Sequence, residues 1–489
     1  MDIAIVGGGS AAVALLDALA VSADEFADRP GSVTVFEPSP QLWRGRPYAA
    51  DLDSVLVNSI PRLMSIRSGD FGHYSGWLGE RSSGHLDQRL GEPLVPRGLY
   101  GEYLVDSAEW ALAALRERGW SCGVVLGPVT NIVTAGDGFV LTTGDEQQHR
   151  ASRLALCAGG GTSPDPYGLS GLPGYIHDPY PLARTLDEIA PESAVSVVGS
   201  GLVAVDIVVS LAARGHSGRI TLHSRSGMLP HVWQRPNPRV SRHLTGERIT
   251  GLYQEQGFVT VDDLVDLVRA EITGAGESFD DFAAEILDTS EDPVARLRRQ
   301  IGAIDDPRIG RRLLRESAHQ LGASVWPLLR ETDRARLRKY FRTVNAVASP
   351  MVPVNALTVL DMLDTGRLRL ARGVRAVEPV SGGFRVHDAT GTGTADTVIN
   401  AVNPAPQAVP AAARGLVDSL VDAGLATRHP EGGITPADPR VHIVGDLSGG
   451  GSFMTTGIPG IAGRAAVTAR ALRGGERLAT PGGRTRLPA

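Results

Sequence analysis

Cysteine is scarce in this chain of 489 residues, since only Cys122 and Cys157 occur. They form no CxxC pair and no cluster with histidine, so the sequence supports neither a redox-active disulfide nor a zinc site, and no metal is expected. We expect two buried thiols in a protein of a reducing compartment.

Long apolar runs are also missing. No stretch of about 18 apolar residues is present, so a membrane span is not expected. The apolar N-terminus lacks the basic segment of a secretion signal, because Asp2 stands there, and the glycines that follow break the helix such a signal needs. The sequence therefore predicts a cytoplasmic protein.

A strong net charge is absent as well. The formal charge of −6 and the pI near 6.1 give no electrostatic reason to expect binding to nucleic acid or to an anionic membrane. The length, with 42% hydrophobic residues, allows two to three folded domains.

What the sequence does contain is a repeated glycine turn. Residues 3–12 and 195–204 each predict a short β-strand, a glycine-rich turn and the start of an apolar helix. Glycines permit the tight bend and let backbone N–H groups approach a pyrophosphate at the positive end of the helix dipole. One such turn is as often structural as functional, but two copies in βαβ context predict two dinucleotide sites. The residues concerned are Gly7, Gly9, Ser10 and Ala12 in the first copy, and Gly199, Gly201 and Ala204 in the second.

The residues after each helix distinguish the two nucleotides. Glu37 closes a predicted strand at 32–37 and is placed to accept hydrogen bonds from a ribose diol, which suits the adenosine half of FAD. After the second helix, Ser224 and Arg225 stand where an acid is expected. A carboxylate would repel a 2′-phosphate, whereas a hydroxyl and a guanidinium bind it, so NADPH is favoured over NADH. The alternative is that Arg225 is a solvated loop residue.

A third pattern lies near the end of the chain. Residues 440–446 predict a strand that ends in Gly445 and Asp446, and a glycine-rich loop and a helix at 461–467 follow. The arrangement resembles two-dinucleotide flavoproteins, in which a Gly-Asp in this place holds the ribitol and phosphate of FAD and the next helix points its N-terminus at the pyrimidine edge of the isoalloxazine. The resemblance assigns that role to Asp446; the alternative is an aspartate that caps the next helix.

Together these patterns predict an α/β fold with two Rossmann-like dinucleotide-binding domains, the second inserted in the first. Buried strands at 154–160 and 398–404, each after a polar β-hairpin pattern, look like the two crossover points. We expect FAD-binding segments at 1–180 and 346–489, and an NADPH-binding domain at 181–345 whose charged helical stretches form an insertion at about 240–345.

Apart from the helical insertion, nearly the whole chain resembles the class B flavin monooxygenases, the relatives of flavin-containing monooxygenases and amine N-hydroxylases. The signatures that carry this resemblance are Asn58-Ser59-Ile60-Pro61 and residues 96–104. The resemblance implies that Asn58 lies by the C4a edge of the flavin and steadies a peroxide there. The alternative is an asparagine in an ordinary turn.

Two further sites follow from the same resemblance. His177 falls where the family has a glycine-histidine-aromatic fingerprint between the nucleotide domains, although the spacing here is one residue short, and the alternative is a histidine that satisfies a local turn. Arg97, with Tyr100 and Tyr103, is assigned to clamp the flavin or its phosphates from a helix start. For the two tyrosines, packing in the core is the alternative.

The resemblance implies an NADPH- and O2-dependent flavoprotein monooxygenase. It would form a flavin C4a-hydroperoxide and oxygenate a small substrate, by N-hydroxylation of an amine or amino acid. The alternatives are a carbon-oxygenating flavoenzyme of the Baeyer–Villiger or hydroxylating kind, an NADPH oxidase, and a non-catalytic flavin-binding regulatory protein. A homo-oligomer is left open.

Two segments are candidates for handling the substrate. Asn58 and the loop at 452–456 would shield the reaction from water, because a wetted hydroperoxide decays to H2O2. Arg308, Arg311 and Arg312 offer planar forks for a substrate carboxylate. The alternative is that these arginines form the solvated face of a helix.

Overall fold

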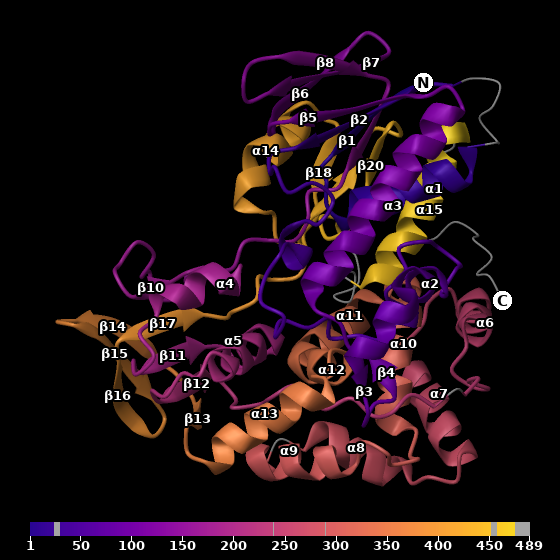
Figure 1. Ribbon diagram of the computed structural model, residues 1–489. Helices are drawn as coiled ribbons and strands as arrows, with labels where there is room; N and C mark the ends of the chain where they lie inside the picture. The colour runs from indigo at the N-terminus through magenta and orange to yellow at the C-terminus, as the bar shows by residue number, and fades with distance from the viewer. Residues whose placement is uncertain (24–29, 238, 289, 451–456, 475–489) are drawn as a thin grey trace.

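In the computed structural model, the chain forms two parallel β-sheets and a helical lobe, which are the upper, left and lower parts of the molecule in Figure 1. The structure describes residues 1–23, 30–237, 239–288, 290–450 and 457–474. Among these residues, no helix combines the length and the apolar character needed to cross a membrane. The predicted α/β class is confirmed.

The first sheet has the strand order β20-β9-β1-β2-β5, and its neighbouring strands pair in parallel. Its central strands are buried on both faces, as parallel strands usually are. The helices α1, α3 and α15 pack together on one face, while the hairpin strands β6 and β7 and helix α14 cover the other. The bounds are β1 Asp2–Val6, α1 Ser10–Val21, β2 Ser32–Glu37, α3 Arg97–Glu117, β5 Ser121–Leu126, β6 Val129–Ala135, β7 Gly138–Thr143, β8 Gln148–Ala151, β9 Arg153–Leu156, α14 Arg414–Asp422, β20 Val441–Ile443 and α15 Ile458–Gly474.

The second sheet has the order β10-β17-β11-β12-β13, again with parallel pairing. Helices α5 and α13 lie on one face, and an antiparallel hairpin sheet lies on the other. The bounds are β10 Tyr175–Ile176, α4 Leu182–Thr185, β11 Val195–Val198, α5 Leu202–Ala213, β12 Ile220–Ser224, α13 Pro353–Asp364, β13 Leu368–Arg372, β14 Ala376–Val380, β15 Gly383–Asp388, β16 Gly391–Ala395 and β17 Thr397–Asn400.

The predicted boundary at 346 is wrong. The strands β13 and β17 pair with the second sheet, so the chain returns to the first sheet only after Asn400. Likewise β10 pairs with β17, so the second domain begins before residue 181. The physical reason is that parallel neighbours belong together wherever they lie in the sequence, and a strand pattern alone does not reveal its sheet.

The two crossovers follow β9 and β17, the strands at the two predicted points. Each is preceded by antiparallel strands, β6-β7-β8 before β9 and β14-β15-β16 before β17, as the polar hairpin patterns predict. Short elements complete the domains: η2 Arg46–Tyr48, η3 Pro61–Leu63, α2 His73–Leu78, η4 Gly79–His85, β3 Leu86–Asp87, β4 Glu92–Pro93, η5 Leu186–Glu188, η7 Ala411–Ala413, β18 Ala426–Arg428 and β19 Ile434–Pro436.

The predicted helical insertion is present between β12 and α13. Its helices enclose a core of their own that includes Ile249, Ile272, Leu313 and Trp326. Thr260 begins α7 with a reciprocal capping box, in which Asp263 is the partner. The bounds are α6 Gly246–Gln256, α7 Val261–Gly274, α8 Phe279–Leu287, α9 Pro293–Gly302, α10 Gly310–Val325, η6 Trp326–Leu328, α11 Glu331–Lys339 and α12 Phe341–Ala348.

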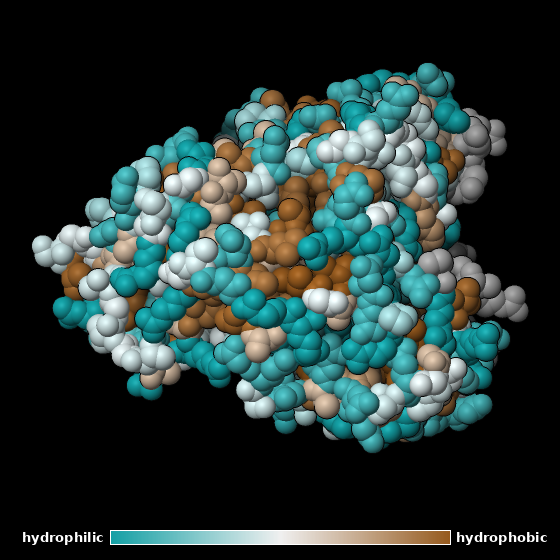
Figure 2. Space-filling view, turned by 60° about the horizontal axis from the view of Figure 1, so that its bottom comes forward, coloured by the Kyte–Doolittle hydropathy of each residue, from teal (hydrophilic) through white to brown (hydrophobic). Residues whose placement is uncertain are grey.

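Apolar side chains gather in a recess near the centre of one face of the molecule, with hydrophilic side chains around it (Figure 2). The two cysteines form no disulfide, and both are free thiols. Cys157 is buried, and burial raises its pKa to about 12, whereas Cys122 is half-buried rather than buried as expected.

Candidate functional site: two glycine turns and the segment between them

The carboxyl ends of β1, β9 and β20 meet at one edge of the first sheet, because Val6 pairs with Leu156 and Leu156 with Ile443. In open parallel sheets ligands bind at this edge. Gly7 has a φ of 102°, and a methyl group on it would lie 2.2 Å from the carbonyl oxygen of Cys157. Only glycine therefore fits at the first turn.

Asp446 reaches the same edge. A methyl group on Gly160, in the turn after β9, would lie 2.8 Å from Asp446 Oδ2, and one on Gly445 would lie 3.6 Å from the Ala11 side chain of α1. The structure therefore brings the first glycine turn and the Gly-Asp pair together. The glycine at 451 and the predicted shielding loop at 452–456 lie outside the described residues.

The N-terminus of α1 fits a pyrophosphate. Its N-cap residue is Gly9, no side chain caps the helix, and its first turn has no acidic residue. Ser10 is the first helical residue, and Ala12 is fully buried, which keeps the helix close to the sheet. Uncapped N–H groups at a positive helix end are the usual site for a bound anion.

Glu37 ends β2 directly beside this turn. One carboxylate oxygen accepts a hydrogen bond from the Gly8 N–H at 2.6 Å, and the other accepts from the Ser39 N–H at 2.9 Å. The backbone thereby fixes the carboxylate at the ligand edge of the sheet. Each oxygen keeps further lone pairs for a ribose hydroxyl, so the predicted ribose contact remains a prediction.

The second glycine turn is built in the same way. Gly199 has a φ of 135°, and a methyl group on it would lie 2.6 Å from the Ala401 carbonyl oxygen. Gly201 is the N-cap of α5, which no side chain caps, and a methyl group there would meet nothing within 4 Å. Ala204 is fully buried under the helix. The close approach lies on the sheet side, and the side that would hold a pyrophosphate is open.

The end of β12 carries Ser224 and the exposed Arg225. Ser224 Oγ accepts a hydrogen bond from the Gly227 N–H at 2.8 Å, and Arg225 forms no ion pair with a described residue. Sequence reasoning missed Arg372, which pairs with Ser224 at the end of β13. A methyl group on Gly227 would lie 2.7 Å from Arg372 Cγ, so this second arginine covers the same turn. The signal was an exposed arginine at the end of the next strand.

Asn58 lies in a segment shared by both domains. The Val57 N–H donates to the Val95 carbonyl, and the Arg97 N–H donates to the Val55 carbonyl, each at 2.8 Å. Val55 packs in the core of the second domain and Val57 in that of the first. The Asn58 amide is shielded from solvent, yet neither Oδ1 nor Nδ2 has a hydrogen-bond partner among the described residues. A buried amide without partners fits a polar ligand group.

Arg97 lies at the domain junction, and its predicted contact with the flavin stays a prediction. Arg97 begins α3, and its guanidinium donates to Asp206 Oδ2 at 2.5 Å, to the Leu56 carbonyl at 3.1 Å and to Tyr180 Oη at 3.2 Å. Asp206 is a fully buried residue of α5 in the other domain. The guanidinium is therefore committed to the domain junction, because a buried carboxylate demands a charged partner.

The charges at this junction depend on each other. Burial raises the pKa of Asp206, and the charge of Arg97 opposes that rise. Burial also disfavours the charge of Arg97, but Asp206 and Tyr180 keep its pKa above the usual value. Tyr100 and Tyr103 are fully buried, and Tyr100 Oη donates to the Met64 carbonyl at 2.9 Å. The tyrosines therefore pack in the core, as the alternative for them held.

His177 directly follows β10 at the ligand edge of the second sheet, where its carbonyl accepts a hydrogen bond from Asn400 Nδ2 at 3.2 Å. Its Nδ1 is buried and has no partner within the described chain. The neighbouring Asp178 pairs with Arg46 of the first domain at 2.7 Å. His177 thus lies at the junction, while its role stays a prediction.

The three arginines proposed for a substrate carboxylate divide. Arg308 is exposed and pairs with Asp306, as on a solvated face. Arg311 and Arg312 are only 7% and 6% exposed, so the solvated-face alternative does not hold for them. Sequence reasoning could not find this, because the helices that bury them lie elsewhere in the chain.

Comparisons with known proteins agree with this geometry. Residues 4–161 match a family model described as FAD-NAD(P)-binding. No curated protein matches the chain. Among solved structures, the chain is similar to L-lysine 6-monooxygenase from Pseudomonas syringae, with 16% identity, a TM-score of 0.54 and coverage of 96% of this chain and 100% of that one. It is also similar to ornithine N-hydroxylase from Kutzneria sp. 744, with 13% identity, a TM-score of 0.52 and coverage of 97% and 99%.

At these identities the likeness shows the fold. The matched domain and that fold define the class of the protein, a two-domain α/β protein of the dinucleotide-binding kind whose first domain matches an FAD-NAD(P)-binding model.

Proposed function

We propose that the chain is an NADPH- and O2-dependent flavin monooxygenase that hydroxylates the nitrogen of a small amine or amino acid. The observation that carries the proposal is the Asn58 segment, which packs in the cores of both domains and presents a buried amide without partners among the described residues. FAD, when bound, would accept the hydride and activate O2. The side chains of the protein bind and orient the reactants and exclude water. A cytoplasmic location is part of the same proposal.

The residues divide by cofactor. Each glycine turn binds a pyrophosphate through its helix N-terminus, and a residue after the next strand recognises the ribose or its phosphate. At the junction, the Asn58 amide donates hydrogen bonds to the reacting groups or accepts hydrogen bonds from them. His177 orients the nicotinamide of NADPH. The FAD residues are Gly7, Gly9, Ser10, Ala12, Glu37 and Asp446, and the NADPH residues are Gly199, Gly201, Ser224 and Arg225.

One observation favours nitrogen as the site of oxygenation. The similar structures are named for a lysine 6-monooxygenase and an ornithine N-hydroxylase, and the latter is a complex with reduced FAD, NADP+ and L-ornithine. Oxygenation also requires a dry site to avoid release of H2O2, and the apolar recess in Figure 2 is a surface that a bound ligand could cover.

The test compares NADPH consumption with H2O2 release in air, for the FAD-loaded protein and a panel of amines, amino acids and ketones. A true substrate raises NADPH consumption and suppresses H2O2, and mass spectrometry then locates the added oxygen. An oxygen on carbon overturns the N-hydroxylation. Equal amounts of NADPH and H2O2 with every compound indicate an oxidase, and no NADPH consumption above the buffer rate indicates a non-catalytic flavoprotein.

A further inference from the structure

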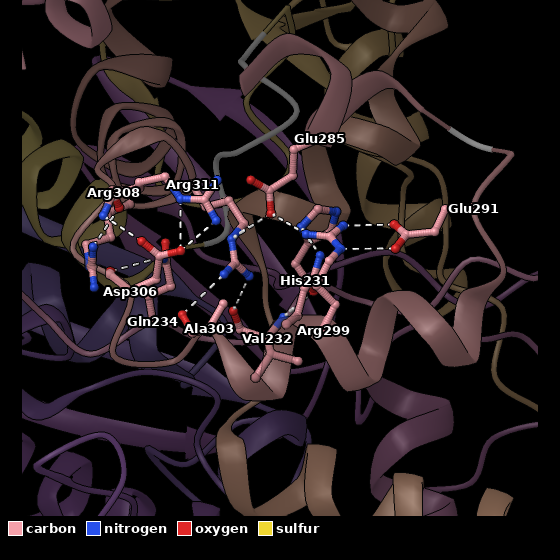
Figure 3. A network of polar contacts seen from close by, with 12 residues as sticks. His231, Val232, Gln234, Glu285, Glu291, Arg299, Ala303, Asp306, Arg308 and Arg311 are labelled. Atoms are coloured by element: carbon pink, nitrogen blue, oxygen red, sulfur yellow. Dashed lines mark hydrogen bonds and ion pairs between the residues drawn. The ribbon is translucent and has the colours of Figure 1, made fainter. Parts of the chain in front are cut away.

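The helical insertion contains arginines that are almost completely buried, which is rare for arginine unless each one meets an acid. They belong to α9 and α10, and their exposed fractions are 6% for Arg296, 7% for Arg311, 6% for Arg312 and 3% for Arg315. Figure 3 shows the part of this polar network around Arg311, Arg299 and Glu285.

The acids of this network are shared. Glu285 pairs with Arg311 at 3.3 Å and with Arg299 at 3.2 Å, and Arg299 also pairs with Glu291 at 2.8 Å (Figure 3). Each carboxylate carries a single negative charge, so Glu291 compensates Arg299 and Glu285 is left to compensate Arg311. Arg296 donates to the Leu229 carbonyl at 3.3 Å and forms no ion pair with a described residue.

The second half of the network also contains one arginine without an ion pair. Glu316 pairs with Arg315 at 2.9 Å and with Arg62 at 3.9 Å. Arg312 donates to the carbonyls of Arg235 and Arg308, at 2.8 and 2.7 Å, and forms no ion pair within the described part of the chain. Arg296 and Arg312 are therefore buried cations without an ion-pair partner in the described chain, which is costly unless an anion joins them, although the nearby Asp306 and Glu316 favour the charge of Arg312.

A small cavity of about 10 Å³ lies among these side chains, with room for one water-sized group such as a single carboxylate oxygen. Arg315 stacks on the Trp233 ring at 3.9 Å, and both residues line the cavity. Arg315 Nε and Trp233 Nε1 are buried donors without hydrogen-bond partners among the described residues. The exposed fraction of Trp233 is 2%, so solvent does not satisfy its indole N–H.

Other groups at the cavity agree with a positive surrounding. Burial, together with the charges of Arg296 and Arg311, lowers the pKa of His231 to about 3. Burial also lowers the pKa of Arg315 to about 10, although Glu316 opposes that shift. The guanidinium of Arg315 is thus held in a place where burial disfavours its charge despite its ion pair with Glu316.

The cavity lies on the side of the insertion that faces the two dinucleotide sites. Trp233 packs against Ile60, two residues beyond Asn58. His319 lies on α10, one turn after Arg315. A methyl group on Gly457, just before the start of α15, would lie 3.2 Å from His319 Nδ1. The helix that carries Arg315 therefore runs between the Asn58 segment and the helix predicted to face the flavin.

We propose that this cavity is a subsite for a carboxylate group, with Arg315 Nε and Trp233 Nε1 as its donors and Arg311 and Arg312 as the surrounding positive charge. The carboxylate belongs either to the substrate of the proposed reaction or to a free small anion. Both sources share one chemistry, an oxyanion that accepts charge-assisted hydrogen bonds. The substrate source rests on the proposed function, whereas the subsite itself does not.

Acetate is the probe for the subsite. In the full-length, FAD-loaded protein, a bulky sulfonate buffer anion is replaced stepwise by acetate at fixed pH and ionic strength, and the thermal unfolding midpoint is measured. We expect the midpoint to rise and saturate, because a ligand that binds the folded state stabilises it by mass action. Trp233→Phe keeps the ring and removes one donor, so half-saturation should need about 10-fold more acetate.

Arg308→Lys is the matched control, because Arg308 pairs with Asp306 at the rim and does not line the cavity, and its acetate dependence should equal that of the wild type. Arg315→Lys keeps the charge but loses Nε, and circular dichroism checks its fold. If Arg315→Lys is unfolded, the acetate titration of Trp233→Phe alone tests the subsite. No saturable effect of acetate, or wild-type half-saturation in Trp233→Phe, means that the cavity holds a water only and overturns the subsite.

Steady-state kinetics distinguish the two sources. L-ornithine is compared with putrescine and L-lysine with cadaverine, since each pair differs by the α-carboxylate. If the carboxylate is the substrate's, acetate inhibits competitively, and Trp233→Phe raises KM about 10-fold for the amino acid and not for the diamine. Stabilisation by acetate without inhibition assigns the subsite to a free anion. No turnover of any compound overturns the proposed function, while the acetate titration still decides the subsite.

Discussion

Asp206 Oδ2 lies 2.5 Å from Arg97 Nη2, and this ion pair joins helix α5, which starts at the second glycine turn, to helix α3 of the first domain. The same guanidinium donates to the carbonyl of Leu56, two residues before Asn58. A single buried charge pair thereby connects the helix predicted to bind NADPH with the segment predicted to contact the flavin.

The first prediction concerns this pair. Asp206→Asn keeps the shape of the side chain but leaves the buried Arg97 charge uncompensated, so the free energy of unfolding should fall by about 3–5 kcal/mol. Urea denaturation measures the change. The NADPH KM should rise in the same variant, because α5 and the Asn58 segment lose their common anchor.

An exposed pair provides the control. Arg298 and Asp364 lie 2.7 Å apart with side chains 58% and 43% exposed, so Asp364→Asn should cost less than about 1 kcal/mol. Equal losses in Asp206→Asn and Asp364→Asn would show that the Arg97 pair contributes no more than a surface contact.

The second prediction concerns Asn58. Its amide is buried without partners in the described chain, so Asn58→Leu should leave the stability of the FAD-free protein unchanged or raise it by about 1 kcal/mol. With FAD bound and a substrate present, the variant should release more H2O2 per NADPH consumed. A loss of more than about 2 kcal/mol in the FAD-free protein would mean that the amide has protein partners instead.

Some of these residues could be predicted from the sequence alone. Both glycine turns, the Gly-Asp pair and the acid at the end of β2 were predictable, because a strand, a tight turn and a helix are encoded within a dozen residues. Asn58 was found only through resemblance to a family. Local sequence patterns therefore predict which edge of a parallel sheet binds a dinucleotide.

What the sequence could not predict depends on distant partners. Arg97 and Asp206 are 109 positions apart, and nothing near Arg97 indicates a buried carboxylate. The burial of Arg311 follows from Glu285, which lies on a different helix of the insertion. The boundary at 346 failed for a related reason, since the residues of β12 and β13 that pair with each other are 148 positions apart.

The third prediction concerns the choice of nicotinamide cofactor. Arg225→Ala should weaken NADPH binding about 10- to 100-fold and leave NADH nearly unchanged, because only NADPH has the 2′-phosphate. Arg372→Ala should act in the same direction, since Arg372 covers the Gly227 turn. The ratio of KM values for the two cofactors is the measurement.

Arg385→Ala serves as the control for lost charge, because Arg385 is an exposed residue of the hairpin strand β15. It should leave the ratio of KM values unchanged. Equal loss for NADPH and NADH in Arg225→Ala would show that Arg225 does not recognise the 2′-phosphate.

The last prediction concerns acid sensitivity. His442 lies in β20 with 2% of its surface exposed, and neither ring nitrogen has a hydrogen-bond partner among the described residues. Burial, with the charge of Arg153 adding to it, lowers the pKa of this histidine from 6.5 to about 4. Between these values the unfolded chain binds a proton that the folded chain does not, so stability falls as the pH falls from 6.5 to 4.

Replacing the ring by an apolar side chain should remove this contribution. For His442→Leu, the free energy of unfolding should decrease less than that of the wild type over the same interval, by roughly 3 kcal/mol at pH 4. Urea denaturation at pH 4, 5, 6 and 7 gives the two curves. The remaining acid sensitivity belongs to other groups, including His223, whose pKa burial lowers to about 4, and carboxylates with a lowered pKa such as Glu271. Parallel curves for the two proteins would mean that His442 is protonated in the folded state, and the polar atoms around β20 would then have to include an acceptor for its proton.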